Sequence, residues 1–428
     1  MLLIYTQKPS SRITYSVKHI CTRILGIEVQ ITSVIEELIS YTGPKLSYGK
    51  QPLGNEFFIQ SHELLTQQGF EAIEIVVKDW NDTKCFFAVS DKSALPFDIF
   101  AASFYLLSRY EEYLPHVKDE YGRFPASESL AYKEGFIRQP VIDMWAGYFK
   151  AALQQVFPKL VFPKKEMSIH NLVVATQPFA FKQKGLFRSV VGYGYDILKG
   201  RFKQLGTRTR VLLGLQSDPN DTFAWMVDVV KQSKTPLTVF FLLGETTQFE
   251  NSLNTHRQKF KMLVKFVSDY KEVGLICSKS ALTAYETLKL EKRRMETITN
   301  RTLDSAINAE LLVDLPDIYR DLVELEIKRD HTMVYEDTAG FRAGTCTPFL
   351  FYDLDYEIKT PLIIHPIAMT TQGLKKDDAI EGVVDEMMQT VEAVKGTFSI
   401  LFSNTDFSNA TTQQEWRTIF SEKLQQYA

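Results

Sequence analysis

The sequence lacks the cysteine spacing, the charge excess and the long apolar runs that mark several classes of protein. Its four cysteines lie far apart without a Cys-x-x-Cys pair, which argues against a zinc knuckle and a disulfide framework. The formal charge of −3 argues against a dedicated nucleic-acid binder, because such a domain carries a basic excess that neutralises phosphates. No apolar run approaches the ~18 residues of a membrane span. We therefore expect neither a nucleic-acid partner nor a membrane partner.

Two further signals are missing. The apolar run from Leu2 to Tyr5 is much shorter than the roughly 7–15-residue core of a signal peptide, and no basic leader precedes it. We interpret it as a first strand and expect a cytoplasmic protein. No G-x-G-x-x-G or G-x-x-x-x-G-K-[ST] sequence follows an expected strand, which removes the usual nucleotide-binding interpretation.

The length and the pattern of breaks indicate two domains. A chain of 428 residues is too long for one ordinary core. Residues 1–160 are typical of an N-terminal α/β domain, in which Asp98 is expected to cap a helix. Pro158 and Pro163 interrupt the periodicity, so we place the second domain at residues 165–428.

In the second domain, short apolar runs alternate with amphipathic segments. The expected strands are residues 172–176, 211–215, 237–243, 273–277, 361–369 and 398–403, and the expected helices are 257–270, 284–298, 380–394 and 413–427. This alternation is typical of buried parallel strands with crossover helices. It favours a β/α barrel over an open doubly wound sheet.

Five stretches, among them GFRAGTCTPFLFYDL at 340–354, carry a resemblance to a known family. The other four are residues 93–124, 179–185, 217–223 and 236–245. Together they resemble a bacterial branch of the polysaccharide deacetylases, which remove acetyl groups from amino sugars. The resemblance implies a distorted (β/α)7 barrel for residues 165–428, an N-terminal α/β domain, and a role in polysaccharide metabolism.

The resemblance also implies a specific set of chemical groups. In the family, one aspartate and two histidines hold a divalent cation such as zinc, which binds the acetyl oxygen and a water molecule. A second aspartate acts as general base and a late histidine as general acid. These groups lie at the carboxyl ends of barrel strands, where side chains from different strands converge.

This chain replaces each of those groups that the resemblance can match. Val174 and Thr176 stand where the D-x-D pair belongs, and Ile276 stands where a metal-binding histidine belongs. Ser403 replaces the late histidine, and residues 306–309 offer no imidazole. The resemblance therefore implies a deacetylase fold that has lost its metal site, for which we expect no cofactor.

Six residues are candidate contacts for a carbohydrate ligand: Arg342, Phe179, Phe181, Lys182, Tyr352 and Asp353. Arg342 matches the family arginine that orients the catalytic base, so it is also the one candidate catalytic residue. It could equally pair with a loop carboxylate such as Asp353 or Asp355, or bind an anionic or hydroxyl group of a ligand. The aromatic residues could stack on a sugar or line a hydrophobic barrel mouth.

Other reactive residues fit ordinary roles. His365 lies near the end of an expected strand, but a single imidazole cannot form a metal site without further ligands. We interpret His331 as a polar residue near a turn and Cys277 as a small buried hydrophobic residue. Asp218 and Asp221 favour helix capping over a catalytic carboxylate pair.

These observations lead to three hypotheses. The first is a pseudoenzyme with a carbohydrate-binding, regulatory or scaffolding role. The alternative is an active hydrolase that removes acetyl groups from a glycan with relocated ligands. In a third hypothesis the N-terminal domain acts and the barrel serves as its platform.

Overall fold

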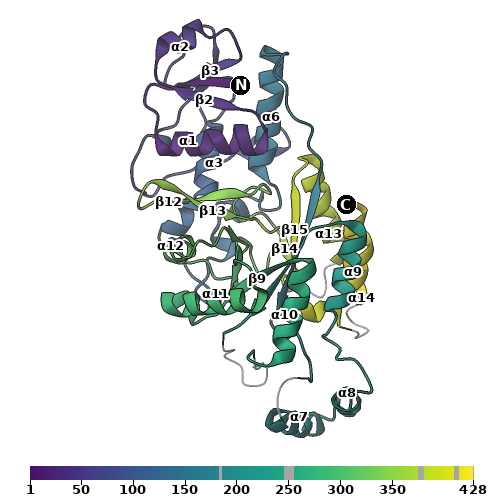
Figure 1. Cartoon of the computed structure of the whole chain (residues 1–428). Helices are drawn as coiled ribbons and strands as arrows, with labels where there is room; N and C mark the ends of the chain where they lie inside the picture. Colours follow the sequence, from purple (N-terminus) through teal and green to yellow (C-terminus); the bar gives the residue numbers. More distant parts are fainter. Residues whose placement is uncertain (183–185, 245–254, 375–379, 409–413, 428) are drawn as a thin grey trace. The chain divides into compact units, whose positions relative to one another are not determined.

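The chain folds into two compact units, which are interleaved along the sequence. The computed structural model describes residues 1–182, 186–244, 255–374, 380–408 and 414–427 (Figure 1). Unit 1 comprises Met1–Ser168, Leu311–Met369 and Gly373–Phe398, and unit 2 comprises Ile169–Glu310, Thr370–Gln372 and Ser399–Ala428. The division into residues 1–160 and 165–428 treats each domain as one continuous segment. That division stays a prediction.

Unit 1 begins with a four-stranded parallel sheet in the order β2-β1-β3-β4. Its strands are β1 (Leu2–Tyr5), β2 (Val29–Thr32), β3 (Lys45–Gly49) and β4 (Phe57–Gln60). The first strand is confirmed, since Leu2 and Ile4 are fully buried. The apolar run therefore forms part of a core.

Helices α3 (Ile99–Leu107) and α6 (Val141–Val156) supply much of the core of unit 1. As predicted, Asp98 caps α3, because its carboxylate accepts the N–H groups of Phe100 and Ala101 at 3.0 and 3.1 Å. The same carboxylate accepts the Tyr48 hydroxyl at 2.7 Å and the His62 N–H at 2.6 Å. One buried acid thus joins a helix, a strand and a loop.

The end of the stretch 340–354 is a strand and not only a loop. It forms β12 (Phe349–Asp353), which pairs antiparallel with β13 (Ile358–Ile364). Strand β13 also pairs in parallel with β11 (Arg329–Asp330). All three strands belong to unit 1.

Unit 2 contains a sheet in the order β10-β9-β8-β7-β15. The strands are β7 (Ser168–Ala175), β8 (Leu237–Leu242), β9 (Glu272–Cys277), β10 (Ser305–Asn308) and β15 (Thr397–Ser403), of which the first residues of β7 and β15 belong to unit 1. Pairs β7–β8, β8–β9 and β9–β10 are parallel. The mixed α/β class is confirmed, whereas closure into a barrel stays a prediction.

The helices of unit 2 agree with the sequence pattern in part, because α7 (Leu186–Leu198) and α8 (Phe202–Leu212) were not expected. Helices α10 (Gln258–Tyr270) and α11 (Tyr285–Thr299) lie where they were expected, and α9 (Phe223–Ser233) adds to them. The strand expected at 211–215 is wrong, because α8 continues through Val211. Gly214 has a φ of +76°, which a strand would not adopt.

The remaining helices and strands complete the secondary structure of the described residues. They are α1 (Ser11–Lys18), α2 (Ile35–Ser40), β5 (Lys78–Trp80), β6 (Thr83–Cys85), α4 (Tyr110–Tyr113), α5 (Leu130–Lys133), α12 (Asp317–Glu324), β14 (Met369–Thr370), α13 (Ile380–Ala393) and α14 (Gln414–Thr418). None of the helices in the described ranges combines the length and apolar composition that crossing a bilayer requires.

The buried cap predicts a pH dependence of stability. Burial raises the pKa of Asp98 to about 6, although its four hydrogen bonds act in the opposite direction. The unfolded chain has a pKa of ~3.9, so the folded state binds this proton more tightly. The contribution of Asp98 to the free energy of unfolding is therefore fully present below pH ~3.9 and is lost as the pH rises through about 6.

We expect the difference in unfolding free energy between the wild type and Asp98→Asn to change by up to about 3 kcal/mol between pH ~4 and ~7. Urea unfolding at several pH values measures it. Asp91→Asn is the control, because Asp91 is exposed. If the free energies of unfolding of the wild type and Asp98→Asn changed with pH in parallel, the raised pKa of Asp98 would be contradicted.

Candidate functional site

The carboxyl end of β7 carries the first two of the replaced family positions. Val174 is half-buried within the strand and lies in register with Phe240 of β8. Thr176 follows the strand and is exposed. Valine has no donor atom for a cation, and the threonine hydroxyl stays neutral, so neither side chain replaces the two aspartates of the family.

The other two replaced positions lie in the same sheet. Ile276 is buried in β9 and lies in register with Leu242 on one side and Ile307 on the other. Ser403 ends β15 and caps a short 3₁₀ helix (Asn404–Phe407), where the Asp406 carboxylate accepts the Ser403 N–H at 2.8 Å. Ile276 therefore packs inside the sheet, and Ser403 caps a short helix.

Amide side chains hold the backbone after β7. The buried Asn404 side chain donates to the Gln177 carbonyl at 2.8 Å and accepts the Gln177 N–H at 3.3 Å. Asn220 donates to the same carbonyl at 3.0 Å. Loops after β7, α8 and β15 are thus joined by neutral groups, which orient a chain without supplying a base or a metal ligand of the family type.

Asp218 organises the turn that carries three of the candidate ligand contacts. Its buried carboxylate accepts the N–H groups of Ala180, Phe181 and Lys182 at 2.7, 2.9 and 2.9 Å. Capping of α9 by Asp218 or Asp221 is therefore wrong, because the N-cap is Thr222, without a side-chain hydrogen bond. Both carboxylate oxygens of Asp218 already accept backbone N–H groups of the turn.

The three candidates on this turn differ in exposure. Phe179 is buried, whereas Phe181 and Lys182 are half-buried. The guanidinium of Arg208 lies 4.9 Å from the centroid of the Phe181 ring. Phe181 and Lys182 can therefore meet a ligand at the carboxyl end of the parallel sheet, where open α/β sheets bind their ligands.

Arg342 lies in unit 1 and pairs with a carboxylate that the sequence did not indicate. Its Nε and Nη2 donate to the two oxygens of Glu112 at 2.9 and 2.7 Å, and Nη1 donates to the Val334 carbonyl at 3.2 Å. The expected partners Asp353 and Asp355 are wrong, since both bind Arg320. The bidentate pair is buried, so three of the five Arg342 donors are already used.

A second arginine completes this cluster. Arg109 Nε donates to Glu112 at 2.7 Å, Nη2 donates to Glu111 at 2.8 Å, and Nη1 donates to the Arg342 carbonyl. Burial by itself raises the pKa of Glu112, but the charges of Arg342 and Arg109 outweigh it and lower the pKa to about 2. The signal in the sequence is the charged Arg109–Glu112 segment shortly after a helix in which every residue is buried.

The last two candidates also lie in unit 1 and have structural partners. Arg320 binds Asp353 through two hydrogen bonds of 2.7 and 2.9 Å. Tyr352 is buried, and its hydroxyl donates to Glu357 at 3.0 Å. Tyr352 thus lines a core, and Asp353 is a structural acid.

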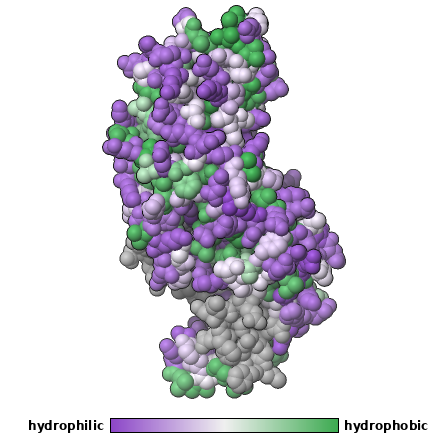
Figure 2. All heavy atoms as spheres, turned by 90° about the vertical axis from the view of Figure 1, so that its left-hand side faces the viewer, coloured by the Kyte–Doolittle hydropathy of each residue, from purple (hydrophilic) through white to green (hydrophobic). Residues whose placement is uncertain are grey.

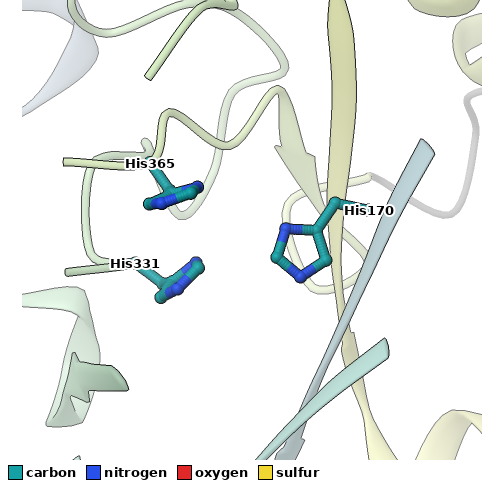
Figure 3. Close-up of side chains that lie close together, drawn as sticks. All are labelled: His170, His331 and His365. Atoms are coloured by element: carbon teal, nitrogen blue, oxygen red, sulfur yellow. The ribbon is translucent and has the colours of Figure 1, made fainter. Parts of the chain in front are cut away.

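Two histidines that the sequence did not bring together are neighbours in unit 1. His331 follows β11 and His365 follows β13, and these strands are parallel with Asp330 in register with Ile364. The next residues on each strand are therefore side by side, and their rings stack with centroids 4.6 Å apart at 23° (Figure 3). The third histidine labelled there, His170, belongs to unit 2 and hydrogen-bonds Thr238 at 3.0 Å.

This histidine pair could supply two metal ligands. One ring nitrogen of His331 and one of His365 lie within 4.8 Å of each other, and His331 is fully buried. Neutral imidazole is a common ligand of zinc, copper and nickel. Two imidazoles can supply half of a tetrahedral zinc sphere. The interpretation of His331 as a polar residue near a turn stays a prediction.

The buried ion pair predicts strong and non-additive effects. We expect Arg342→Ala and Glu112→Ala each to lower the free energy of unfolding by about 3–5 kcal/mol, because each leaves a buried charge without its partner. The double variant should cost clearly less than the sum of the two. Denaturant unfolding of the four proteins measures this coupling.

Arg138→Ala and Glu386→Ala are the matched controls, since that pair lies 2.7 Å apart but is half-exposed. We expect a cost below about 1 kcal/mol for each. Additive losses at Arg342 and Glu112 would contradict the pairing. The pair's contribution should also be lost as the pH falls from ~4.3 to about 2.

Comparison with known proteins gives one family model and several distant structures. Residues 2–158 match the model of a family of unknown function (DUF7033). No curated protein matches the chain. The family match covers the first part of unit 1.

The chain is similar to solved structures of the following proteins. A CE4 family pseudoenzyme from Bacillus anthracis is 10% identical over 62% of this chain and 62% of its own, with a TM-score of 0.31. A putative polysaccharide deacetylase from Mycobacterium smegmatis is 8% identical over 62% of this chain and 88% of its own, with a TM-score of 0.36. A polysaccharide deacetylase from Bacillus cereus is 10% identical over 61% of this chain and 89% of its own, with a TM-score of 0.29. The chain spans less than two thirds of the Bacillus anthracis pseudoenzyme.

Proposed function

We propose that this protein is a polysaccharide deacetylase-like pseudoenzyme that binds carbohydrate without hydrolysing it. One observation carries the proposal: Val174, Thr176, Ile276 and Ser403, which the resemblance matches to the family's ligands and proton-transfer groups, lie in or directly after strands β7, β9 and β15. None of the four offers a carboxylate or an imidazole. The proposal includes the (β/α)7 barrel, the N-terminal α/β domain, and a regulatory or scaffolding role in polysaccharide metabolism.

A cytoplasmic location is part of the same proposal. All four cysteines are free and buried. Free thiols persist in a reducing compartment, whereas oxidising compartments favour disulfides. The state of the cysteines therefore supports the location without deciding it.

The proposed ligand site is the turn after β7. Phe181 offers an aromatic face and Lys182 an ammonium donor, both half-buried. Asp218 fixes their backbone through the N–H groups of both residues. A turn fixed before binding loses little conformational entropy when a sugar arrives, which favours affinity.

We expect Phe181→Ala and Lys182→Ala each to weaken binding of an N-acetylglucosamine oligosaccharide by about tenfold, which corresponds to ~1.4 kcal/mol. Isothermal titration calorimetry measures this. Lys259→Ala is the control, because Lys259 is an exposed lysine on α10 of the same unit. Undetectable binding by the wild type, or unchanged binding by both variants, would refute the proposed site.

The histidine pair favours a second candidate function. An active hydrolase with relocated ligands needs imidazoles at a new place, and His331 and His365 stack at the carboxyl ends of two parallel strands. A divalent ion there would polarise an acetyl oxygen and activate water. Unit 1 would then hold the chemistry that the deacetylase positions in unit 2 lack.

For this second function we expect about one zinc ion per chain and weaker zinc binding, by tenfold or more, in His331→Gln and in His365→Gln. Mass spectrometry of metals and a zinc titration measure both. His116→Gln is the control, because His116 lies outside this pair and its Nδ1 is 2.8 Å from the Leu114 carbonyl oxygen. Acetate release from an acetylated oligosaccharide that both variants abolish would establish the hydrolase and overturn the pseudoenzyme.

A further inference from the structure

Helices α7 and α8 of unit 2 form a hairpin that is held together by polar contacts. Arg208 of α8 binds Asp196 of α7 through Nε at 2.9 Å and Nη2 at 2.8 Å. The Tyr193 hydroxyl lies 2.9 Å from the Thr209 hydroxyl. Gly200, with a φ of +65°, allows the turn between the helices. The faces that meet in the hairpin are therefore charged and hydroxylated.

Three apolar side chains in the part of α7 from residue 190 onward face outward. Val190, Ile197 and Leu198 are 67%, 57% and 87% exposed, whereas Asp196 is 2% exposed. Residues 190, 194, 197 and 198 follow the i, i+4, i+7, i+8 spacing of one helix face. A helix of a water-soluble domain normally buries such a face, so α7 is inverted. An exposed apolar face of this kind marks an interaction site.

The tip of the hairpin alternates apolar and basic residues. Phe202 is 71% exposed and follows Leu198 across the turn. Lys199, Arg201 and Lys203 are interleaved with these residues and are also exposed. Figure 2 shows hydrophobic side chains near its lower edge, the height at which Figure 1 draws α7 and α8. Apolar groups and positive charges thus reach solvent together.

The local charge differs in sign from that of the whole chain. Residues 189–215 contain five lysines or arginines and one aspartate, a net charge of five minus one, or +4, against −3 for the whole protein. The single aspartate is Asp196, which Arg208 neutralises. The outward charge of the hairpin is therefore entirely basic among its described side chains.

These features select an anionic membrane surface over the other partners. Two hairpins of this charge would repel each other, which disfavours a second copy of the chain. Nucleic acid would satisfy the lysines and arginines but leave Leu198 and Ile197 without an apolar environment. A bilayer interface satisfies both, because basic groups reach anionic headgroups while aliphatic groups enter the acyl boundary.

We propose that the α7–α8 hairpin docks this protein on anionic lipid surfaces, with Ile197, Leu198 and Phe202 inserted at the headgroup boundary. Helix α7 has 13 residues and lies in the interface, since a span requires ~20. The expectation of no membrane partner rested on the absence of an apolar run long enough to span a bilayer, and the proposal departs from that expectation. The proposal uses residues of unit 2 other than Phe181 and Lys182, and Arg208 of the hairpin lies 4.9 Å from the centroid of the Phe181 ring.

Sedimentation with vesicles tests this surface. We expect the full-length protein to bind vesicles that contain about 30% phosphatidylserine, and to bind pure phosphatidylcholine vesicles at least tenfold more weakly. Binding should weaken as the ionic strength rises, because salt screens the basic groups. Absence of binding to the anionic vesicles at low ionic strength would overturn the proposal.

Two variants separate the contributions of the apolar and the basic side chains to vesicle binding. Leu198→Asn and the double variant Lys199→Glu/Arg201→Glu should each reduce binding by about tenfold or more. Val161→Asn is the matched control, because Val161 is 82% exposed in unit 1. Circular dichroism checks that all three variants keep the wild-type fold.

Two results would overturn the proposal with these variants. One is equal binding by the wild type and both hairpin variants. The other is a dimer in analytical ultracentrifugation that Leu198→Asn disperses while no protein binds vesicles, because the apolar face would then join two copies of the chain.

Discussion

A buried ion pair between Arg342 and Glu112 is the interaction on which the order of unit 1 depends. The two residues are 230 positions apart, and the bidentate geometry fixes both the distance and the plane of their side chains. Arg109 binds the same carboxylate and also the Arg342 carbonyl. Because a buried charge without a partner is very unfavourable, these segments must meet in one geometry.

That pairing assigns a structural role to the arginine of the stretch at 340–354. Its arginine has the residue type that a deacetylase uses to orient a base, yet its guanidinium is committed to Glu112 and to the Val334 carbonyl. In unit 2, Asp218 is likewise committed to the turn after β7. Charged groups that could serve a reaction instead hold segments of the chain together, which agrees with the proposed loss of chemistry.

The α7–α8 hairpin differs from an ordinary packed helix pair, which buries its apolar side chains and exposes its charged ones. It places an ion pair inside, between Asp196 and Arg208, and leaves aliphatic side chains outside. The free energy of folding gains little from the exposed apolar face, because those side chains remain in water. Such an arrangement becomes favourable only when another apolar phase covers the face, and the surrounding basic residues indicate which phase that is.

The sequence by itself determined the features that depend on local pattern or on residue type. Continuous apolar runs identified β7, β8, β9 and β15, because strands buried on both faces show no alternation. Asp98 was identified as a cap from its place before an apolar helix. The sequence also shows directly that residues 174, 176, 276 and 403 carry neither a carboxylate nor an imidazole.

Only the tertiary structure decided which distant residues meet. Glu112 of helix α4 became the partner of Arg342 through a long-range ion pair. His331 met His365 because parallel strands align residues that the sequence separates. The inverted face of α7 was equally hidden, since its spacing is that of an ordinary amphipathic helix until burial is known. Long-range pairing and burial are set by the packing of the whole unit, and local periodicity carries no information about either.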